Sequence, residues 1–155
     1  AQGIGQQVVQ GLADTYAVLM AALARRTGNH GLSPSGLNAL VLLARAGAKG
    51  HPLCELSRML LVSAANITGV VDNLSRKGFV RRAIDHRDRR VRIAKITPAG
   101  EALLDSVLPG HYAEVRQLLG GLGDREKAAA CRLLAKLRRG IEHSEPDAGK
   151  SKGRR

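Results

Sequence analysis

The residues of this chain that could do chemistry are short hydrogen-bonding and cationic groups of the kind that contact nucleic acid. Small and polar side chains occur together between Ser63 and Gly69. A helix with short side chains can lie deep in a DNA major groove, where an Asn amide binds both polar atoms of an adenine edge. We therefore expect the DNA-contacting residues of this segment to be Ser63, Ala64, Ala65, Asn66, Thr68 and Gly69, with Asn66 as the best candidate for an adenine contact.

A strongly basic segment follows. Between Arg76 and Lys95 the chain has nine Lys or Arg and two Asp, a local excess of seven positive charges within a net charge of +12. The loop at residues 85–90, Asp-His-Arg-Asp-Arg-Arg, lies between strand-like runs at residues 79–84 and 91–96. A protruding hairpin can place guanidinium groups in the narrow minor groove, where the potential is most negative. The pattern predicts DNA contacts by Arg87, Arg89 and Arg90 in this loop, and phosphate contacts by Arg76, Arg81 and Arg82.

Catalytic and metal chemistry have no matching pattern. The two cysteines, Cys54 and Cys131, form no CxxC motif, and the five histidines form neither an i, i+4 pair nor an HExxH motif. We therefore expect no enzyme, no cofactor and no metal site. Two alternatives stay open: oxidant sensing through Cys54, which requires an exposed and easily ionised thiol, and a metal site in which His30 and His111 converge with Cys54.

The net charge of +12 implies an acidic partner, either nucleic acid or an anionic membrane surface. Tyr16, Phe79 and Tyr112 are the three aromatic residues, whereas modules that bind RNA or single strands stack bases on aromatic rings. Duplex DNA is therefore the better match, and a sequence-blind architectural DNA-binding protein is the alternative. We see neither a signal-peptide pattern nor an apolar run of membrane-spanning length, so we expect no membrane partner and a cytoplasmic location.

The elements that must position these groups are mainly helical. Apolar residues at helical spacing predict a short helix with Leu53, Leu56 and Leu60 on one face. A second helix should begin after Ser63, bury Ile67, Val70, Val71 and Leu74, and end at Gly78.

Further helices have their own start and stop signals. Ser33-Pro34 and Thr97-Pro98 each combine an N-cap hydroxyl with proline at the first helical position. We expect a helix at residues 4–26, a kink or interruption at Pro109-Gly110, and capping of the last helix by Asp124.

The order of these motifs resembles a known family. A helix and turn lead to a Ser-x-x-Asn-x-Thr helix, a Gly-Phe-Val strand, an Asp-x-Arg-Asp-Arg-Arg loop and Ile-Thr-Pro-Ala-Gly. This order, over roughly residues 32–137, resembles the winged helix-turn-helix of MarR-type transcriptional regulators. The resemblance matches Arg90 to the family's minor-groove arginine and Asp88 to the acid that orients it. Leu61 stands where the family often has glycine, and we expect its backbone to avoid positive φ.

The resemblance also implies an architecture. The fold class is mainly α (α+β): a winged helix-turn-helix lobe at residues 32–97 and dimerisation helices at residues 1–31 and 98–142. Residues 143–155 are polar and rich in helix breakers with nothing to bury, so their composition predicts a disordered basic tail. The helix at residues 4–26 could otherwise pack on its own domain. The predicted dimer contacts are Ile4, Val8, Leu12, Leu19, Leu133, Leu137 and Ile141.

The function implied is that of a homodimeric repressor on a pseudo-palindromic operator. Ser33 and Ser35 match positions that touch phosphates in the family, although helix capping alone would also explain them. Release by a small aromatic or phenolic effector, bound between the DNA-binding lobe and the dimerisation helices, follows from the resemblance alone.

Overall fold

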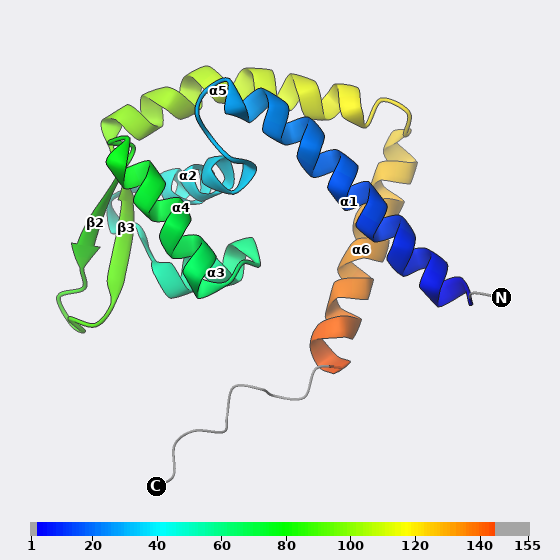
Figure 1. Ribbon diagram of the computed structural model, residues 1–155, viewed down its shortest axis with the longest axis horizontal. Coiled ribbons are helices and arrows are strands. Elements are labelled where there is room, and N and C mark those ends of the chain that lie inside the picture. Colours follow the sequence, from blue (N-terminus) through cyan, green and yellow to red (C-terminus); the bar gives the residue numbers. More distant parts are fainter. Residues whose placement is uncertain (1–2, 145–155) are drawn as a thin grey trace, which may run out of the picture. The chain divides into compact units, whose positions relative to one another are not determined.

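The computed structural model describes residues 3–144. The chain divides into two compact units, Ala1–Ala113 and Glu114–Arg155, and the boundary falls within one helix. The elements, labelled in Figure 1, are α1 (Ile4–Gly28), α2 (Pro34–Ala46), the short 3-10 helix η1 (Gly47–Lys49), β1 (His51–Pro52), α3 (Leu53–Leu60), α4 (Ala64–Arg76), β2 (Val80–Ile84), β3 (Arg92–Ile96), α5 (Pro98–Leu118) and α6 (Asp124–Ser144). The mainly helical fold class is thus confirmed.

Hydroxyl caps begin three of the helices, as predicted. The Ser33 hydroxyl oxygen accepts the N–H of Gly36 at 3.0 Å, and that of Ser63 accepts the N–H of Asn66 at 3.1 Å. The Thr97 hydroxyl oxygen accepts the N–H of Gly100 at 3.1 Å. Each cap satisfies a backbone donor that has no partner inside its own helix.

The core of the first unit lies among α2, α3, α4 and the sheet. Its nearly inaccessible side chains include Leu37, Leu40, Leu43, Leu56, Ile67, Val71 and Leu74. Burial of the predicted apolar stripe of α4 leaves the opposite side of this helix in solvent.

A three-stranded antiparallel sheet has the strand order β1-β3-β2. The paired strands β2 and β3 form the predicted hairpin, with Val80 opposite Ile96 and Ile84 opposite Arg92. Strand β1 has two residues, too few for an alternating pattern, and the sequence did not indicate it. We call residues 79–97, the hairpin with its loop, the wing.

The turn between α3 and α4 overturns the expectation for Leu61. Leu61 has φ 54° and ψ 42°, in the left-handed region. The N–H of Val62 donates to the Ser57 carbonyl at 3.0 Å, and the N–H of Leu61 donates to the Arg58 carbonyl at 3.2 Å. These two bonds close a Schellman motif, and Val62 packs against the core. The bonds and this burial offset the strain at a non-glycine residue.

Gly78 shows the same motif with the expected residue. Its φ is 78°, and the N–H of Phe79 donates to the Leu74 carbonyl at 3.0 Å. Helix α4 therefore ends where predicted, and the chain turns directly into β2.

The C-terminal predictions need three corrections. Pro109 lies inside a continuous α5, so the predicted interruption is wrong and the kink stays a prediction. Asp124 is the first residue of α6, and Glu126 caps the helix instead by accepting the N–H of Gly123 at 2.7 Å. His143 and Ser144 belong to α6, so the prediction of a disordered tail is wrong for these two residues; the rest of that prediction, residues 145–155, lies outside the described residues.

Helix α1 also corrects the sequence analysis. It is long and apolar enough to cross a membrane by length and composition, because Asp14 is the one charged residue between Ile4 and Ala24. Of the most apolar 18-residue stretch of α1, 6% is buried within this chain. A helix that packs its apolar side on another protein surface has the same composition, so this property alone does not indicate a membrane span.

Candidate nucleic-acid interface

The outer side of α4 presents the short side chains singled out in the sequence. Exposed positions are Ser63 just before the helix and Ala64, Ala65, Asn66, Thr68 and Gly69 in its first two turns. No charged side chain lies in these two turns. The helix can therefore approach another surface closely along this side.

Internal hydrogen bonds determine what this face can offer to bases. The Thr68 hydroxyl donates to the Ala64 carbonyl at 2.9 Å, which leaves its oxygen as an acceptor on an exposed residue. The Ser63 hydroxyl oxygen is occupied by its cap bond. The side-chain amide of Asn66 has no hydrogen-bond partner among residues 3–144, so both its donors and its acceptor are available to a base edge.

A hollow of about 460 Å³ separates the start of α2 from α4. It brings Ser33 together with Ala65, Asn66 and Gly69 from the predicted set, whereas Ser35 is half-buried and does not line it. The other lining residues are Gly31, Leu32, Gly36, Val70, Asn73, Leu74 and Lys77. Asn73 and Lys77 are polar members of this face that the sequence analysis did not select.

The wing loop is held by two carboxylates. One Asp85 oxygen accepts the N–H groups of Arg87 at 2.6 Å and Asp88 at 3.3 Å. One Asp88 oxygen accepts the N–H of Arg90 at 2.9 Å. Asp88 therefore fixes the backbone at Arg90 and does not contact its guanidinium group. The side chains of Arg87, Arg89 and Arg90 are exposed.

The electrostatics of this loop follow from the same bonds. The backbone N–H groups of Arg87 and Asp88 hold the pKa of Asp85 below its ordinary value of 3.8, and the charges of Arg87 and His86 act in the same direction. Sequence reasoning missed Asp85, although an Asp two residues before a loop tip is a known turn signal. The carboxylate thus organises the arginine-bearing backbone.

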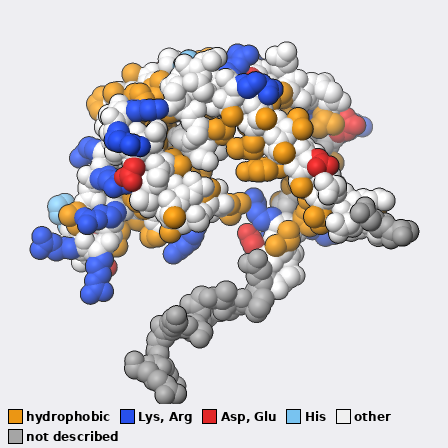
Figure 2. Space-filling view, viewed as in Figure 1, with side chains coloured by type: hydrophobic (Ala, Val, Ile, Leu, Met, Phe, Trp, Pro, Cys, Tyr) orange, Lys and Arg blue, Asp and Glu red, His pale blue; other side chains and the backbone are white. Residues whose placement is uncertain are grey.

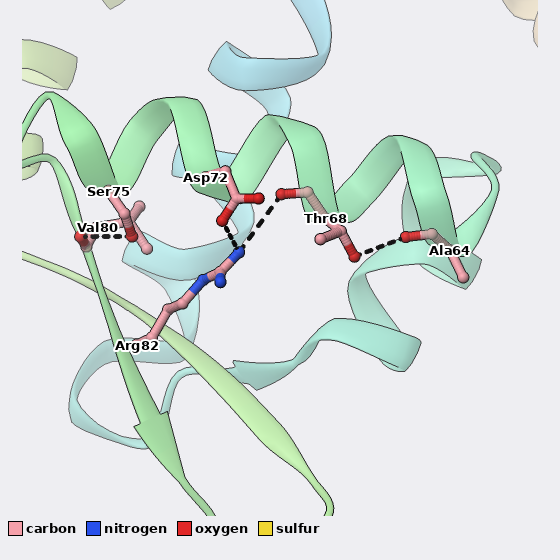
Figure 3. Close-up of polar contacts among 6 residues, drawn as sticks. All are labelled: Ala64, Thr68, Asp72, Ser75, Val80 and Arg82. Atoms are coloured by element: carbon pink, nitrogen blue, oxygen red, sulfur yellow. Dashed lines mark hydrogen bonds and ion pairs between the residues drawn. The ribbon is translucent and has the colours of Figure 1, made fainter.

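Arg82, a predicted phosphate contact, has partners within the protein. Its guanidinium group forms an ion pair with Asp72 and donates to the Thr68 carbonyl at 3.5 Å, as Figure 3 shows. Arg76 and Arg81 are exposed and remain predicted phosphate contacts. In the space-filling view, Lys and Arg side chains gather over the wing and the neighbouring part of the first unit (Figure 2).

The alternatives based on metal or redox chemistry find limited support. Within residues 3–144, no three His, Cys, Asp or Glu side chains gather closely enough to hold a metal ion. Both cysteines are free and exposed, so Cys54 meets one of the two requirements for an oxidant sensor.

Apolar side chains remain exposed on helices of both units. Among the predicted dimer contacts, Ile4 is 77%, Val8 48% and Leu19 38% exposed on α1, while Leu12 is half-buried. On α6, Leu133 is 66%, Leu137 37% and Ile141 54% exposed. Exposed apolar side chains gathered on two helices are typical of an interaction site.

Comparison with known proteins agrees with the geometry. A family model described as MarR family matches residues 32–91. The chain is 33% identical over 108 residues to the HTH-type transcriptional regulator MhqR of Bacillus subtilis, covering 70% of this chain and 73% of that protein. It is 36% identical over 109 residues to the HTH-type transcriptional repressor YetL of the same organism, covering 69% and 64%. Both relatives are named as regulators of transcription.

Solved structures share the fold. Sco3205 from Streptomyces coelicolor, a MarR family transcriptional regulator solved in complex with DNA, matches with a TM-score of 0.85. The match covers 95% of this chain and 93% of that chain at 23% identity.

Proposed function

The chain belongs to the MarR family of transcriptional regulators, and on that premise we propose that it represses transcription as a homodimer bound to a pseudo-palindromic operator in the cytoplasm. The observation that carries this proposal is the combination, in one compact unit, of an α4 face with short side chains and a wing with exposed arginines. An α-helix fits the major groove and an arginine-bearing hairpin fits the minor groove.

The two elements have separate tasks. Asn66 and Thr68 present groups that distinguish base edges, and the Thr68 methyl group suits a thymine methyl. Arg87, Arg89 and Arg90 supply charge for the narrow minor groove. Ser33, Arg76, Arg81 and Lys77 flank the α4 face and suit phosphates, which orient the protein without reading sequence.

The exposed apolar side chains of α1 and α6 support dimerisation. Burial of apolar surface stabilises by roughly 25 cal/mol per Å². A second copy of the chain that covers these side chains would therefore make the free energy of association more favourable. A dimer with two-fold symmetry places two α4 helices one helical turn of DNA apart, which matches an inverted-repeat operator. Variants that place a charge on α1 or α6, such as Val8→Glu and Leu133→Glu, should be monomers in analytical ultracentrifugation. The part of the chain that contains α4 and the wing should keep its fold in both.

Release by a small aromatic or phenolic effector completes the proposal and rests on family membership. Titration of phenolic acids into the protein–operator complex, read by calorimetry and gel shift, should reduce DNA affinity. If no compound changes the affinity for DNA, release by an effector is contradicted. The DNA-binding proposal would be unaffected.

The central experiment selects bound fragments from genomic DNA and measures affinity by fluorescence anisotropy at 0.15 M salt. Arg90→Ala should weaken binding to the selected operator at least about tenfold, equivalent to about 1.4 kcal/mol. The matched control is Arg45→Ala, because Arg45 is exposed at the opposite end of α2 from Ser33. Its affinity should stay near the wild-type value.

Two outcomes would contradict the proposal. Equal affinity for the operator and for scrambled duplex, with a steep salt dependence, would identify a sequence-blind architectural protein. Wild-type operator affinity in Arg90→Ala would contradict the proposed role of the wing in DNA binding.

A further inference from the structure

The structure assigns Arg82 and Asp72 a positioning role: we propose that this pair holds the wing at a fixed angle to α4 so that both elements fit their grooves at once. The inference rests on the proposed DNA-binding function and deepens it. It concerns a residue that charge alone would place among the phosphate contacts.

The contacts of Arg82 run to α4. Its guanidinium group pairs with the Asp72 carboxylate and also donates to the Thr68 carbonyl at 3.5 Å (Figure 3). Thr68 and Asp72 are four residues apart, so they lie one above the other on the same side of the helix. A planar guanidinium group with several donors can bridge two acceptors in this arrangement, which an ammonium group does less well.

The strand register explains why Arg82 points toward the helix. Side chains two residues apart on a strand share a face. Arg82 therefore shares the face of buried Val80 and lies opposite Ala94, which is also buried, whereas Arg81 lies on the other face opposite Lys95. The two adjacent arginines thus have the same charge and different surroundings.

A second link joins α4 to β2 closer to the turn. The Ser75 hydroxyl donates to the Val80 carbonyl at 3.2 Å (Figure 3). This link, the burial of Val80 and the pairing of β3 with β1 restrain the base of the wing. The Arg82 contacts lie further along α4 and β2 and limit the remaining freedom of the angle between them.

The length of the wing makes this freedom costly for DNA binding. From Gly78 to Ile84 the strand advances about 20 Å, at roughly 3.3 Å per residue. A swing of about 10° would displace the wing loop by roughly 3–4 Å, more than half of the about 6 Å width of a minor groove. Wing and helix would then fit their grooves together in a smaller fraction of molecules.

Removal of Asp72 separates positioning from phosphate binding, because the two roles predict opposite signs. If Arg82 bound a phosphate, Asp72→Ala would free its guanidinium group and delete a nearby negative charge, so DNA affinity would rise. If Arg82 positions the wing, the same change weakens operator binding. Ala also has a higher helix propensity than Asp, so the change does not weaken α4 itself.

The experiment measures Asp72→Ala, Arg82→Ala, the double variant and the control Arg81→Ala against operator and scrambled duplex. We expect Asp72→Ala and Arg82→Ala each to weaken operator binding about fivefold, as when the competent population falls to about one fifth. The double variant should be no weaker than either single variant. Arg81→Ala should weaken binding to both duplexes by the same factor.

A second measurement needs no DNA. Heteronuclear NOE values of the wing-loop amides at residues 86–90 should fall in Asp72→Ala and Arg82→Ala and stay unchanged in Arg81→Ala. Unchanged values, or tighter operator binding by Asp72→Ala, would overturn the positioning role even though the wild-type protein binds its operator. A wild-type protein without operator preference would instead remove the proposed function, and the NOE values would still decide whether the pair holds the wing.

Discussion

Gly100→Ala tests the packing that joins α5 to the wing. Gly100 lies in the first turn of α5, where a Cβ would be 2.3 Å from the Phe79 carbonyl oxygen and 2.8 Å from Cγ1 of Ile96. The Phe79 carbonyl cannot move away without loss, because it also accepts the N–H of Thr97 at 3.0 Å. The substitution must therefore displace the start of α5 from the hairpin.

The expected magnitude combines two opposing effects. Overpacking a tight contact lowers the free energy of unfolding by about 1–3 kcal/mol, and the higher helix propensity of Ala offsets up to about 1 kcal/mol of this loss. We expect a net loss of about 1–2 kcal/mol in the free energy of unfolding. With a urea dependence of about 2 kcal/mol per M, the unfolding midpoint should fall by about 0.5–1 M.

The same substitution elsewhere in α5 is the control. A Cβ on Gly110 would meet nothing within 4 Å, so Gly110→Ala should raise the free energy of unfolding by up to about 1 kcal/mol. Both variants are unfolded in urea and followed by far-UV circular dichroism at one fixed protein concentration, since association shifts apparent stability. If Gly100→Ala is as stable to urea as the wild type, or is stabilised as Gly110→Ala is, the close approach of Gly100 to Phe79 is refuted.

Three further predictions concern backbone positions around the interface. Leu61→Gly should be about 1 kcal/mol more stable to urea than Leu61→Ala, because only Ala keeps a Cβ in the left-handed region; equal stability would argue against positive φ at this residue. Ser63→Ala should cost about 1 kcal/mol through loss of the cap on α4, whereas Ser63→Asp, which can still accept the N–H of Asn66, should stay near the wild type. Because the pKa of Asp85 is lowered in the folded protein, its contribution is present above the ordinary value of 3.8 and is lost as pH falls through the lower folded value. The side-chain carboxyl carbon signal of Asp85 should therefore stay constant from about pH 7 to about pH 5 and change only in stronger acid, and a transition of that signal at or above pH 3.8 would contradict this assignment.

Local patterns explain why so much of the fold could be predicted. The hydroxyl caps at Ser33, Ser63 and Thr97 act on N–H groups three residues away, so neighbouring residues suffice to identify them. The same holds for the glycine at residue 78 that ends α4. The exposure of Asn66 and Thr68 followed from helical periodicity, because the apolar stripe determines which side of α4 remains outside.

Contacts between distant residues explain the failures. Leu61 adopts positive φ because Val62 can then pack against the core, which no local propensity reveals. Strand β1 exists because His51 and Pro52 meet β3, more than forty residues later in the chain.

The helices, the basic wing and the short side chains of α4 could be predicted from the sequence, because caps, periodicity and charge are properties of neighbouring residues. The use of the charges depends on the tertiary structure. Arg81 and Arg82 are indistinguishable in a charge count, yet strand register directs Arg82 to Asp72 and leaves Arg81 in solvent. The physical reason is that pairing depends on which face a side chain occupies and on what lies across from it, and both are set by packing.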